Sequence, residues 1–437
     1  MIERDYTPRR EASRGETPRR SAAPASARRS APSGGSYHRR PPKKSGPPPI
    51  LYVGLLLIVA IVVVIVLFAT GVFGGNKDPK PENSGQSTVS AGSAQSGSQA
   101  SQVSSNPASQ VSSTPSSQAD ATPEPKDMTN AKAEDLGPLL LVDGAGYEYY
   151  NFVESTANDY ITTVTDAGTS LEGTATVYDM VIPTSMGILL PQEFIDKKGF
   201  NSNPQDKAIN YLYSSVDAIN PKVKTVPIYD ALKAHSDEYI YFRTDHHWTQ
   251  LGAYYAYEEF AKLAGFKPLA LSEFEKKEYT GFLGSFYSDS GNNPKLETNP
   301  DTVEAYFPPC DTTMNVVEPR NGDPLDDWPL IYDDSDGEYS ASLKYNVFIA
   351  GDNPYTEITN NDLSDGSSIV VVKESFGNAF VPFLAPHYQH IYVIDYRYWS
   401  GNVKELCTEK SVKNVLLLNN ISMTRNDDLV SDLGTVF

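Results

Sequence analysis

The chain has 437 residues and a formal net charge of −19, from 55 acidic and 36 basic residues. This acidic balance argues against nucleic acid as a partner. The two cysteines, Cys310 and Cys407, are too few for a disulfide framework and lack the spacing of a zinc site, so we expect them to be unpaired or joined in one bridge.

The first part of the sequence predicts a membrane anchor. Residues 1–49 carry 12 basic and 4 acidic residues, and residues 50–73 form an uncharged apolar run of 24 residues. A run of this length crosses a hydrocarbon core of ~30 Å as a helix. It begins too far from the N-terminus for a signal peptide and lacks a small-residue cleavage site. The basic excess predicts a disordered cytoplasmic tail in contact with anionic lipid, a single-pass transmembrane helix, and a C-terminal part outside the cell.

A low-complexity segment follows the apolar run. Residues 74–136 are rich in Ser, Gln and Pro and poor in large apolar side chains. Such a composition does not offset the entropy of ordering, so we expect a disordered extracellular stalk. The stalk would let the folded part reach material beyond the bilayer.

Residues 137–437 have the composition of a folded domain. Near-continuous Val, Ile, Leu and Tyr runs separated by helix-length gaps predict an α/β fold with a mostly parallel sheet covered on both faces. Residues 270–344, rich in Asp, Asn, Pro and Gly, are expected to be an irregular, partly β insertion. We predict strands at 139–143, 178–184, 223–230, 345–352, 368–375, 390–397 and 412–420, and helices at 152–167, 206–219 and from Thr249 to Ala264, the last capped by Gly265.

The segment "RTDHHWT" places an Asp and two histidines before the last of these helices. If Arg243–Trp248 is extended, Asp245 and His247 share one side and His246 faces the other. Asp245 would then hold one ring nitrogen of His247, leaving the other to act as a general base. His246 and Arg243 are expected to support the turn, and Thr249 to cap the helix.

Two further segments supply candidates at predicted strand ends. In "VVVKESFGNAF", Ser375 follows a buried strand and could act as a nucleophile. Gly377 would allow close approach of a substrate, and Asn378 could donate to a developing oxyanion. In "FIAGDNP", Asn353 could donate likewise, although a simple turn is the alternative. On its own, the Ser375 segment is also compatible with an ordinary helix cap.

Other interpretations of the histidine pair remain open at this point. Zinc needs three or four convergent ligands, whereas adjacent histidines on an extended chain point apart. The other C-terminal histidines, His235, His387 and His390, show no ligand spacing, so we predict no metal and no cofactor. A purely structural turn is the second alternative. Ser285 in "FLGSFYSDSGN" is a second candidate nucleophile.

Together, "FRTDHHWTQLGAYYAYEEF", "FLGSFYSDSGN", "FIAGDNP" and "KESFGNAFVPFL" resemble, in this order, the DHHW family of bacterial envelope proteins. The resemblance extends from Leu139 to the C-terminus. It implies a fold similar to SGNH hydrolases and to the alginate O-acetylation proteins, with Asp245 as orienter, His247 as base and Ser375 as nucleophile. The chain departs from the family pattern at Lys-Glu-Ser-Phe, where Lys-Asp-Ser-Tyr is expected, and at Gly-Asp-Asn-Pro, where Gly-Asn-His-Pro is expected.

Two functional hypotheses follow. The first is an extracytoplasmic O-acetyltransferase or acetylesterase acting on cell-wall or exopolysaccharide hydroxyls; by resemblance, a membrane-bound O-acyltransferase could be its partner. The second is a non-catalytic glycan-binding or envelope-assembly protein on the same fold. In that case Tyr254, Tyr255, Tyr398 and Trp399 would serve as stacking platforms.

Overall fold

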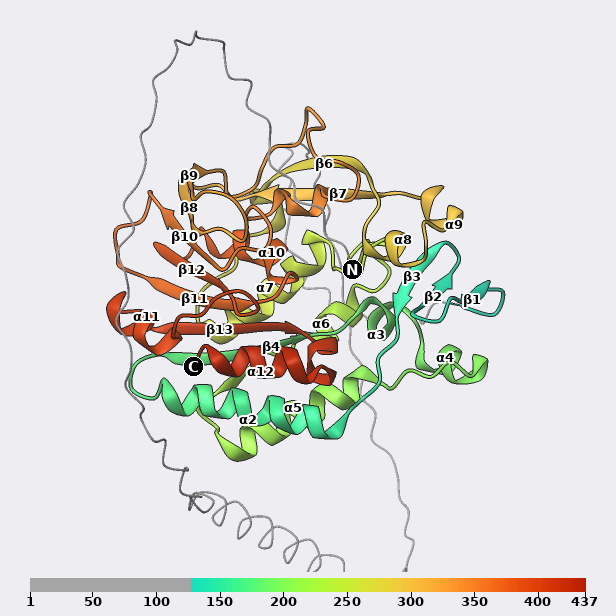
Figure 1. The fold of residues 1–437 in the computed structure, drawn as a ribbon, viewed down its shortest axis with the longest axis horizontal. Helices are drawn as coiled ribbons and strands as arrows, with labels where there is room; N and C mark the ends of the chain where they lie inside the picture. The colour runs from blue at the N-terminus through green and yellow to red at the C-terminus, as the bar shows by residue number, and fades with distance from the viewer. Residues whose placement is uncertain (1–126) are drawn as a thin grey trace, which may run out of the picture. The chain divides into compact units, whose positions relative to one another are not determined.

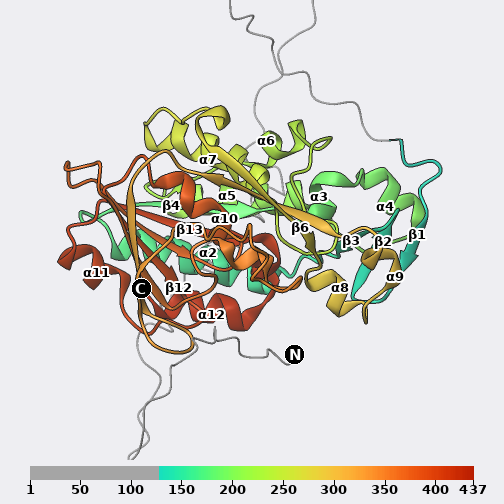
Figure 2. The same cartoon turned by 90° about the horizontal axis from the view of Figure 1, so that it is seen from above.

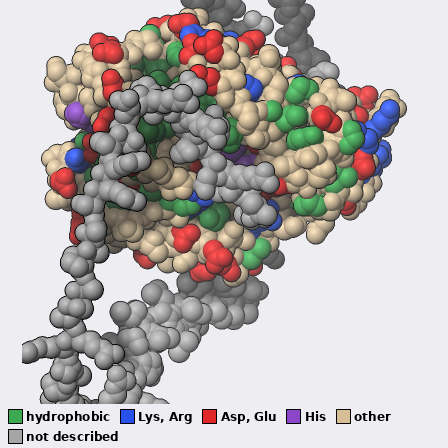
Figure 3. Space-filling model, turned by 45° about the horizontal axis from the view of Figure 1, so that its top comes forward, with side chains coloured by type: hydrophobic (Ala, Val, Ile, Leu, Met, Phe, Trp, Pro, Cys, Tyr) green, Lys and Arg blue, Asp and Glu red, His purple; other side chains and the backbone are tan. Residues whose placement is uncertain are grey.

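The computed structural model describes residues 127–437. The predicted basic tail, the predicted transmembrane helix at 50–73 and the predicted stalk up to residue 126 lie outside the described residues. The predicted end of the stalk at residue 136 is wrong, because residues 127–136 belong to the folded domain and include the paired strand Ala133–Asp135 and the buried Met128. Across residues 127–437, every helix is too short or too polar to span a membrane. Acidic side chains are spread over the face of this part that Figure 3 shows, as expected of a solvated acidic surface.

An eight-stranded mixed sheet forms the centre of the fold (Figure 1), in the order β5-β4-β13-β11-β12-β10-β8-β9. The first five strands in this order run parallel, and β10, β8 and β9 continue the sheet antiparallel. The strands are β4 (Thr176–Ile182), β5 (Lys224–Thr225), β8 (Thr312–Glu318), β9 (Leu325–Trp328), β10 (Tyr355–Asn360), β11 (Ser368–Lys373), β12 (His390–Asp395) and β13 (Asn414–Asn420).

Helices cover both faces of the sheet. Helices α2 (Glu154–Ser170), α5 (Gln205–Ile219), α11 (Val403–Glu409) and α12 (Asp427–Thr435) pack on one face, and α7 (Gln250–Ala264) and α10 (Gly377–Phe380) pack on the other. Within β11, Val370 and Val372 pack against the face covered by α2, α5, α11 and α12. Ile369 and Val371 pack against the opposite face, covered by α7 and α10. Because both faces are buried, the central strands are apolar without interruption.

Smaller elements lie at one end of the domain, opposite α11 (Figure 2). They comprise a three-stranded sheet of β1 (Ala133–Asp135), β2 (Leu139–Val142) and β3 (Ala145–Glu148), together with α3 (Ser185–Leu189), α4 (Gln192–Lys198), α8 (Ser285–Asp289) and α9 (Pro294–Glu297). Helix α6 (Tyr229–Ala234) contacts α7, and the hairpin of β6 (Glu275–Phe282) and β7 (Asp301–Phe307) packs near α7. The 3-10 helices are η1 (Leu271–Glu273), η2 (Lys344–Val347), η3 (Val381–Leu384) and η4 (Ile421–Arg425).

The prediction of a strand at 345–352 is wrong. This segment is the 3-10 helix η2 followed by a turn, in which Ile349 and Ala350 adopt positive φ angles of 46° and 59°. Its apolar side chains, Tyr345 and Phe348 among them, are buried in the core although the backbone forms a compact turn and not an extended strand. Apolar content alone does not distinguish these two ways of filling a core.

The predicted insertion at 270–344 is wrong in part. The segment contains irregular turns and the β6–β7 hairpin, but β8 and β9 join the main sheet beside β10. Strand β8 is buried only at Met314 and Val316, so its sequence alternates as expected for one covered face. The predicted strand at 223–230 also shortens to β5, because α6 begins at Tyr229.

Candidate active site

The loop before α7 is bent and not extended. Residues 243–247 form successive bends between Tyr241 and Trp248, which make an isolated antiparallel bridge. Asp301 holds the loop, accepting from the backbone N–H groups of Arg243 at 3.0 Å and Thr244 at 2.7 Å. The predicted cap is present, since the Thr249 hydroxyl accepts from the Gly252 N–H at 3.3 Å.

This bent loop brings Asp245, His247 and Ser375 into one chain of hydrogen bonds. The Asp245 Oδ1 lies 2.6 Å from His247 Nδ1 and also accepts from the His247 backbone N–H at 2.9 Å. On the other side of the ring, His247 Nε2 lies 2.7 Å from Ser375 Oγ. The Asp and His are nearly buried, at 4% and 6% exposure. The arrangement has the connectivity of a nucleophile, a base and a residue that orients the base.

Ser375 follows β11 and precedes α10, where the backbone turns sharply. Two buried side chains fix this turn. The Trp248 indole N–H donates to the Phe376 carbonyl at 2.9 Å, and the Tyr345 hydroxyl donates to the Ser375 carbonyl at 3.0 Å. A Cβ at Gly377 would lie 2.7 Å from the Lys373 Cβ, so this glycine makes room for Lys373, and its role in substrate approach stays a prediction.

The ring of His247 contacts two other rings that limit its rotation. The ring centroid of Tyr345 lies 4.1 Å away at an interplanar angle of 13°, and that of His246 lies 3.8 Å away at 36°. Tyr345 therefore contacts both the proposed base and the backbone of the proposed nucleophile. It was missed in the sequence because its segment was taken as a strand.

Burial and charge set the protonation of the pair. Burial lowers the pKa of the His247 imidazole to about 4, and His246 acts in the same direction, against the attraction of Asp245. Burial acts to raise the pKa of the Asp245 carboxyl. The charges of His247 and His246, with hydrogen bonds from His247 and Ser285, outweigh burial and hold that pKa well below its usual value. At neutral pH the pair is therefore a carboxylate and a neutral imidazole.

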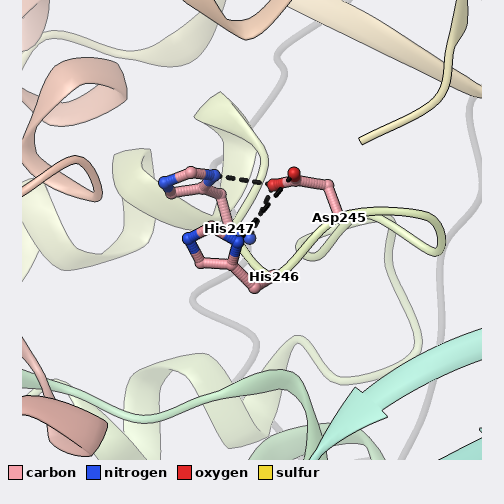
Figure 4. A group of neighbouring side chains, drawn as sticks. All are labelled: Asp245, His246 and His247. Atoms are coloured by element: carbon pink, nitrogen blue, oxygen red, sulfur yellow. Dashed lines mark hydrogen bonds and ion pairs between the residues drawn. The ribbon is translucent and has the colours of Figure 1, made fainter. Parts of the chain in front are cut away.

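His246 does not face away from the site, contrary to the prediction. Figure 4 shows the two imidazole rings side by side, both near the Asp245 carboxylate. The His246 Nδ1 lies 2.6 Å from Ser285 Oγ, and the backbone N–H of Ser285 donates to Asp245 Oδ2 at 2.8 Å. The alternation of side chains holds only for an extended chain, and bends replace that chain here.

The same residues raise the question of a metal ion. Asp245, His246 and His247 each present a ligand-type atom within 4.8 Å of the others, so the prediction that the histidines point apart rested on a wrong premise. However, Asp245 Oδ1 and His247 Nδ1 are 2.6 Å apart, which is the separation of a shared hydrogen. A zinc ion bound to both atoms would need about 2.0–2.1 Å to each, so it would replace this hydrogen bond. In the present arrangement Asp245 and His247 share a hydrogen, and metal binding to both atoms would require its release.

The predicted oxyanion residues have other contacts. Asn378 Nδ2 donates to Asp352 Oδ1 at 2.9 Å, and the side chain is buried. The Asn353 amide accepts from the Arg320 backbone N–H at 3.2 Å and donates to the Ala350 carbonyl at 3.1 Å. Both amides therefore bond protein groups, and oxyanion binding by either stays a prediction. The predicted support residue Arg243 lies 3.3 Å from Asp301, at the base of the loop.

A buried charge cluster lies beneath the Ser375 turn. Lys373, at the end of β11, contacts Asp352 at 3.0 Å and Asp395 at 3.1 Å, and Arg397 contacts the same two carboxylates. Burial acts to lower the pKa of Lys373, but the two carboxylates outweigh it and raise that pKa. The neighbouring Glu374 Oε2 lies 3.3 Å from Ser375 Oγ, farther than the 2.7 Å that separates this oxygen from His247 Nε2. The sequence shows these charges, but only the fold brings them together.

The aromatic residues predicted as stacking platforms do not form a common surface. Tyr254 is buried, and Tyr255 stacks on His235 with ring centroids 3.5 Å apart. Trp399 stacks on the ring of Tyr355. The guanidinium carbon of Arg320 lies 4.2 Å from the ring centroid of Tyr398. Their contacts with other residues give no support to the binding hypothesis.

The family description "DHHW protein" matches residues 97–394 of the chain. The chain belongs to the DHHW family. Within this family motif, Asp245 and His247 make the hydrogen-bonded pair, His246 lies beside it, and Trp248 holds the turn that contains Ser375.

Solved structures share the fold. A DHHW family protein from Eubacterium siraeum is 27% identical, with a TM-score of 0.59, over 70% of this chain and 96% of that one. Bacillus cereus PatB1 is 19% identical with a TM-score of 0.54, over 70% of this chain and all of that one. PatB1 with a sulfonyl adduct is 17% identical at the same TM-score, over 71% and 99%. No curated protein matches the chain.

Proposed function

We propose that this DHHW protein transfers acyl groups through Ser375, with His247 as general base and Asp245 as the residue that orients it. The observation that carries the proposal is the continuous chain of hydrogen bonds, 2.6 Å from Asp245 to His247 and 2.7 Å from His247 to Ser375. The buried, neutral imidazole suits a base, since it is free to accept a proton at neutral pH.

The proposed reaction has two steps. Ser375 Oγ attacks the carbonyl carbon of an ester, and its proton passes to His247 Nε2. The proton then goes to the departing alcohol, leaving an acyl-serine. An incoming hydroxyl gives its proton to His247, attacks the acyl carbon, and releases Ser375, which takes the proton back. Water as the acceptor gives an esterase; an alcohol gives a transferase.

The substrate class that we propose is the hydroxyl groups of cell-wall or secreted polysaccharide, with acetyl as the acyl group. The apolar run at 50–73 and the polar segment at 74–136 support a single-pass location, with the domain outside the membrane and within reach of such glycans. A membrane-bound O-acyltransferase is the proposed source of acyl groups. The fold shared with PatB1 supports an SGNH-hydrolase-like assignment for the domain.

The test is covalent labelling of the full-length chain in detergent. A sulfonyl fluoride should add one sulfonyl group to Ser375, and p-nitrophenyl acetate should release nitrophenol. Ser375→Ala should abolish both, whereas Ser285→Ala should keep the label. If wild type neither labels nor releases nitrophenol above Ser375→Ala, the proposal fails. A label lost only in Ser285→Ala would move the nucleophile to Ser285.

A further inference from the structure

The two histidines of the motif bond different partners through the same ring atom. His247 Nδ1 faces the Asp245 carboxylate, which only accepts hydrogen bonds, so Nδ1 carries the hydrogen and Nε2 is the acceptor. His246 Nδ1 faces Ser285 Oγ at 2.6 Å. That oxygen also accepts from the His246 backbone N–H at 3.2 Å, which favours the Ser285 hydroxyl hydrogen pointing to Nδ1. His246 then carries its hydrogen on Nε2.

This arrangement gives the two rings opposite roles. A neutral His246 with Nδ1 bonded by Ser285 presents an N–H donor at Nε2, and a protonated His246 presents the same donor. His247 presents an acceptor at its own Nε2, toward Ser375. A base and a donor thus stand next to each other on rings whose centroids are 3.8 Å apart.

Both Nε2 atoms point to the same side. Figure 4 shows them directed away from Asp245, with the rings side by side. The His246 side chain is 31% exposed, compared with 8% for His247. Among the described residues, His246 Nε2 has no hydrogen-bond partner, whereas Nδ1 has Ser285. An exposed donor without a protein partner is available to a ligand at the nucleophile.

We propose that His246 Nε2–H binds a second hydroxyl oxygen of the acceptor, adjacent to the hydroxyl that His247 deprotonates. The site would then select vicinal hydroxyl groups, as in a sugar, over a lone hydroxyl or water, neither of which offers a second oxygen. This inference rests on the proposed acyl transfer. During the transfer the acceptor proton passes to His247 Nε2 and on to Ser375 Oγ, and His246 keeps its own proton.

Ser285 and Asp245 keep the two rings in register. The Asp245 carboxylate bonds the His247 ring through Oδ1 and accepts from the backbone N–H of Ser285 through Oδ2. Ser285 therefore fixes the tautomer of His246 while its backbone is fixed by the residue that orients the base. Asp245 thus positions the base directly and the donor through Ser285.

The experiment measures how the acyl-enzyme divides between acceptors. The full-length chain in detergent receives p-nitrophenyl acetate as donor and either 1,2-cyclohexanediol or cyclohexanol as acceptor, and the ratio of acetate ester to free acetate is measured. Only ratios are compared, so a change in overall rate cancels. We expect wild type to favour the diol about tenfold, the effect of one good hydrogen bond.

Two substitutions of His246 separate the donor from the ring. His246→Phe keeps a flat ring and removes the donor, so the preference for the diol should disappear. His246→Gln places an amide N–H near the position of Nε2 and should retain most of the preference. Thermal unfolding of each variant shows that it folds. Equal ratios in wild type and His246→Phe, or no diol preference in wild type, would overturn the inference.

A spectroscopic measurement is independent of turnover. In ¹⁵N-histidine spectra, His246 should carry its hydrogen on Nε2 in wild type and become a mixture of tautomers in Ser285→Ala. A wild-type Nδ1–H tautomer at His246 would overturn the inference and leave the proposed reaction intact. Absence of nitrophenol release that depends on Ser375 would instead overturn the reaction, and this inference with it.

Discussion

The ring of Tyr345 stacks on His247 at a centroid distance of 4.1 Å, while its hydroxyl donates to the Ser375 carbonyl at 3.0 Å. One buried side chain from η2 thus fixes the separation between the proposed base and nucleophile. Tyr345→Phe keeps the stacking and removes the donor, so we expect kcat for p-nitrophenyl acetate to fall about 5- to 10-fold. Tyr345→Leu should cost more, since it removes both contacts.

The matched control is Tyr332→Phe. Tyr332 bonds Glu338 on the partly exposed surface of the same region. Its hydroxyl has no contact with the loop or with the Ser375 turn among the bonds of residues 127–437. Equal activity in Tyr345→Phe and Tyr332→Phe would show that the tether to Ser375 is dispensable.

Asp245→Asn tests the orientation of the base. The amide would keep the shape of the carboxylate but present a donor or a weaker acceptor to His247 Nδ1, which favours the wrong tautomer. We expect a loss of about 10⁴-fold in the rate of sulfonyl labelling at Ser375, with the fold retained. A decrease of less than tenfold in the labelling rate would argue that Asp245 only stabilises the loop.

The pH dependence of labelling should be shifted toward acid. Burial lowers the pKa of His247 to about 4 from an ordinary value near 6.5, so the base remains neutral down to about pH 5. The labelling rate should therefore fall only as pH drops through about 4. Between pH 6.5 and 4 the unfolded chain binds a proton that the folded chain does not, so stability also decreases as pH falls through this window. An acid limb centred near 6.5 would contradict the burial of the ring.

Gly284 permits the close approach of α8 to the loop of residues 243–247. A Cβ at this position would lie 2.3 Å from the Asp245 Cβ and Oδ2, and hydrogen bonds to both carboxylate oxygens hold this side chain in place. Gly284→Ala should displace Asp245 and lower the labelling rate about 10²-fold, because a shift of about 1 Å at a reacting group has effects of this size. Gly434→Ala in α12 is the control: its Cβ would meet its nearest neighbour at 3.8 Å, and activity should not change. Similar rates in both variants would contradict this contact.

Lys373→Met should destabilise the domain by about 3–5 kcal/mol, because it leaves the buried Asp395 and the partly exposed Asp352 with less compensation. Chemical denaturation measures this loss. Lys410→Met removes a half-exposed ion pair with Glu357 and should cost less than about 1 kcal/mol. Equal costs would show that Arg397 alone satisfies the cluster.

Sequence patterns sufficed for the central elements and for the three residues of the hydrogen-bonded chain. Uninterrupted apolar runs predicted β11, β12 and β13, because buried parallel strands need such runs. The local pattern placed Ser375 only between a strand and a turn, and its assignment as nucleophile came from the resemblance to the DHHW family.

What failed depended on tertiary contacts. A bent segment and an extended segment can have the same local composition. The orientation of His246 depends on the bend, which the distant Asp301 holds through the Thr244 N–H. The apolar side chains of η2 fit a strand equally well, and this concealed Tyr345. The partly buried β8 and the pairing of β10 with it depend on contacts between distant segments, which a single sequence does not display.

The structure shows no bond between Cys310 and Cys407. Cys407 lies in α11 at 1% exposure, and burial raises its pKa to about 12. A thiol in this state reacts with a maleimide at neutral pH only when the surrounding core opens. The maleimide modification rate of Cys407 would therefore report how often α11 separates from the sheet, without an engineered cysteine.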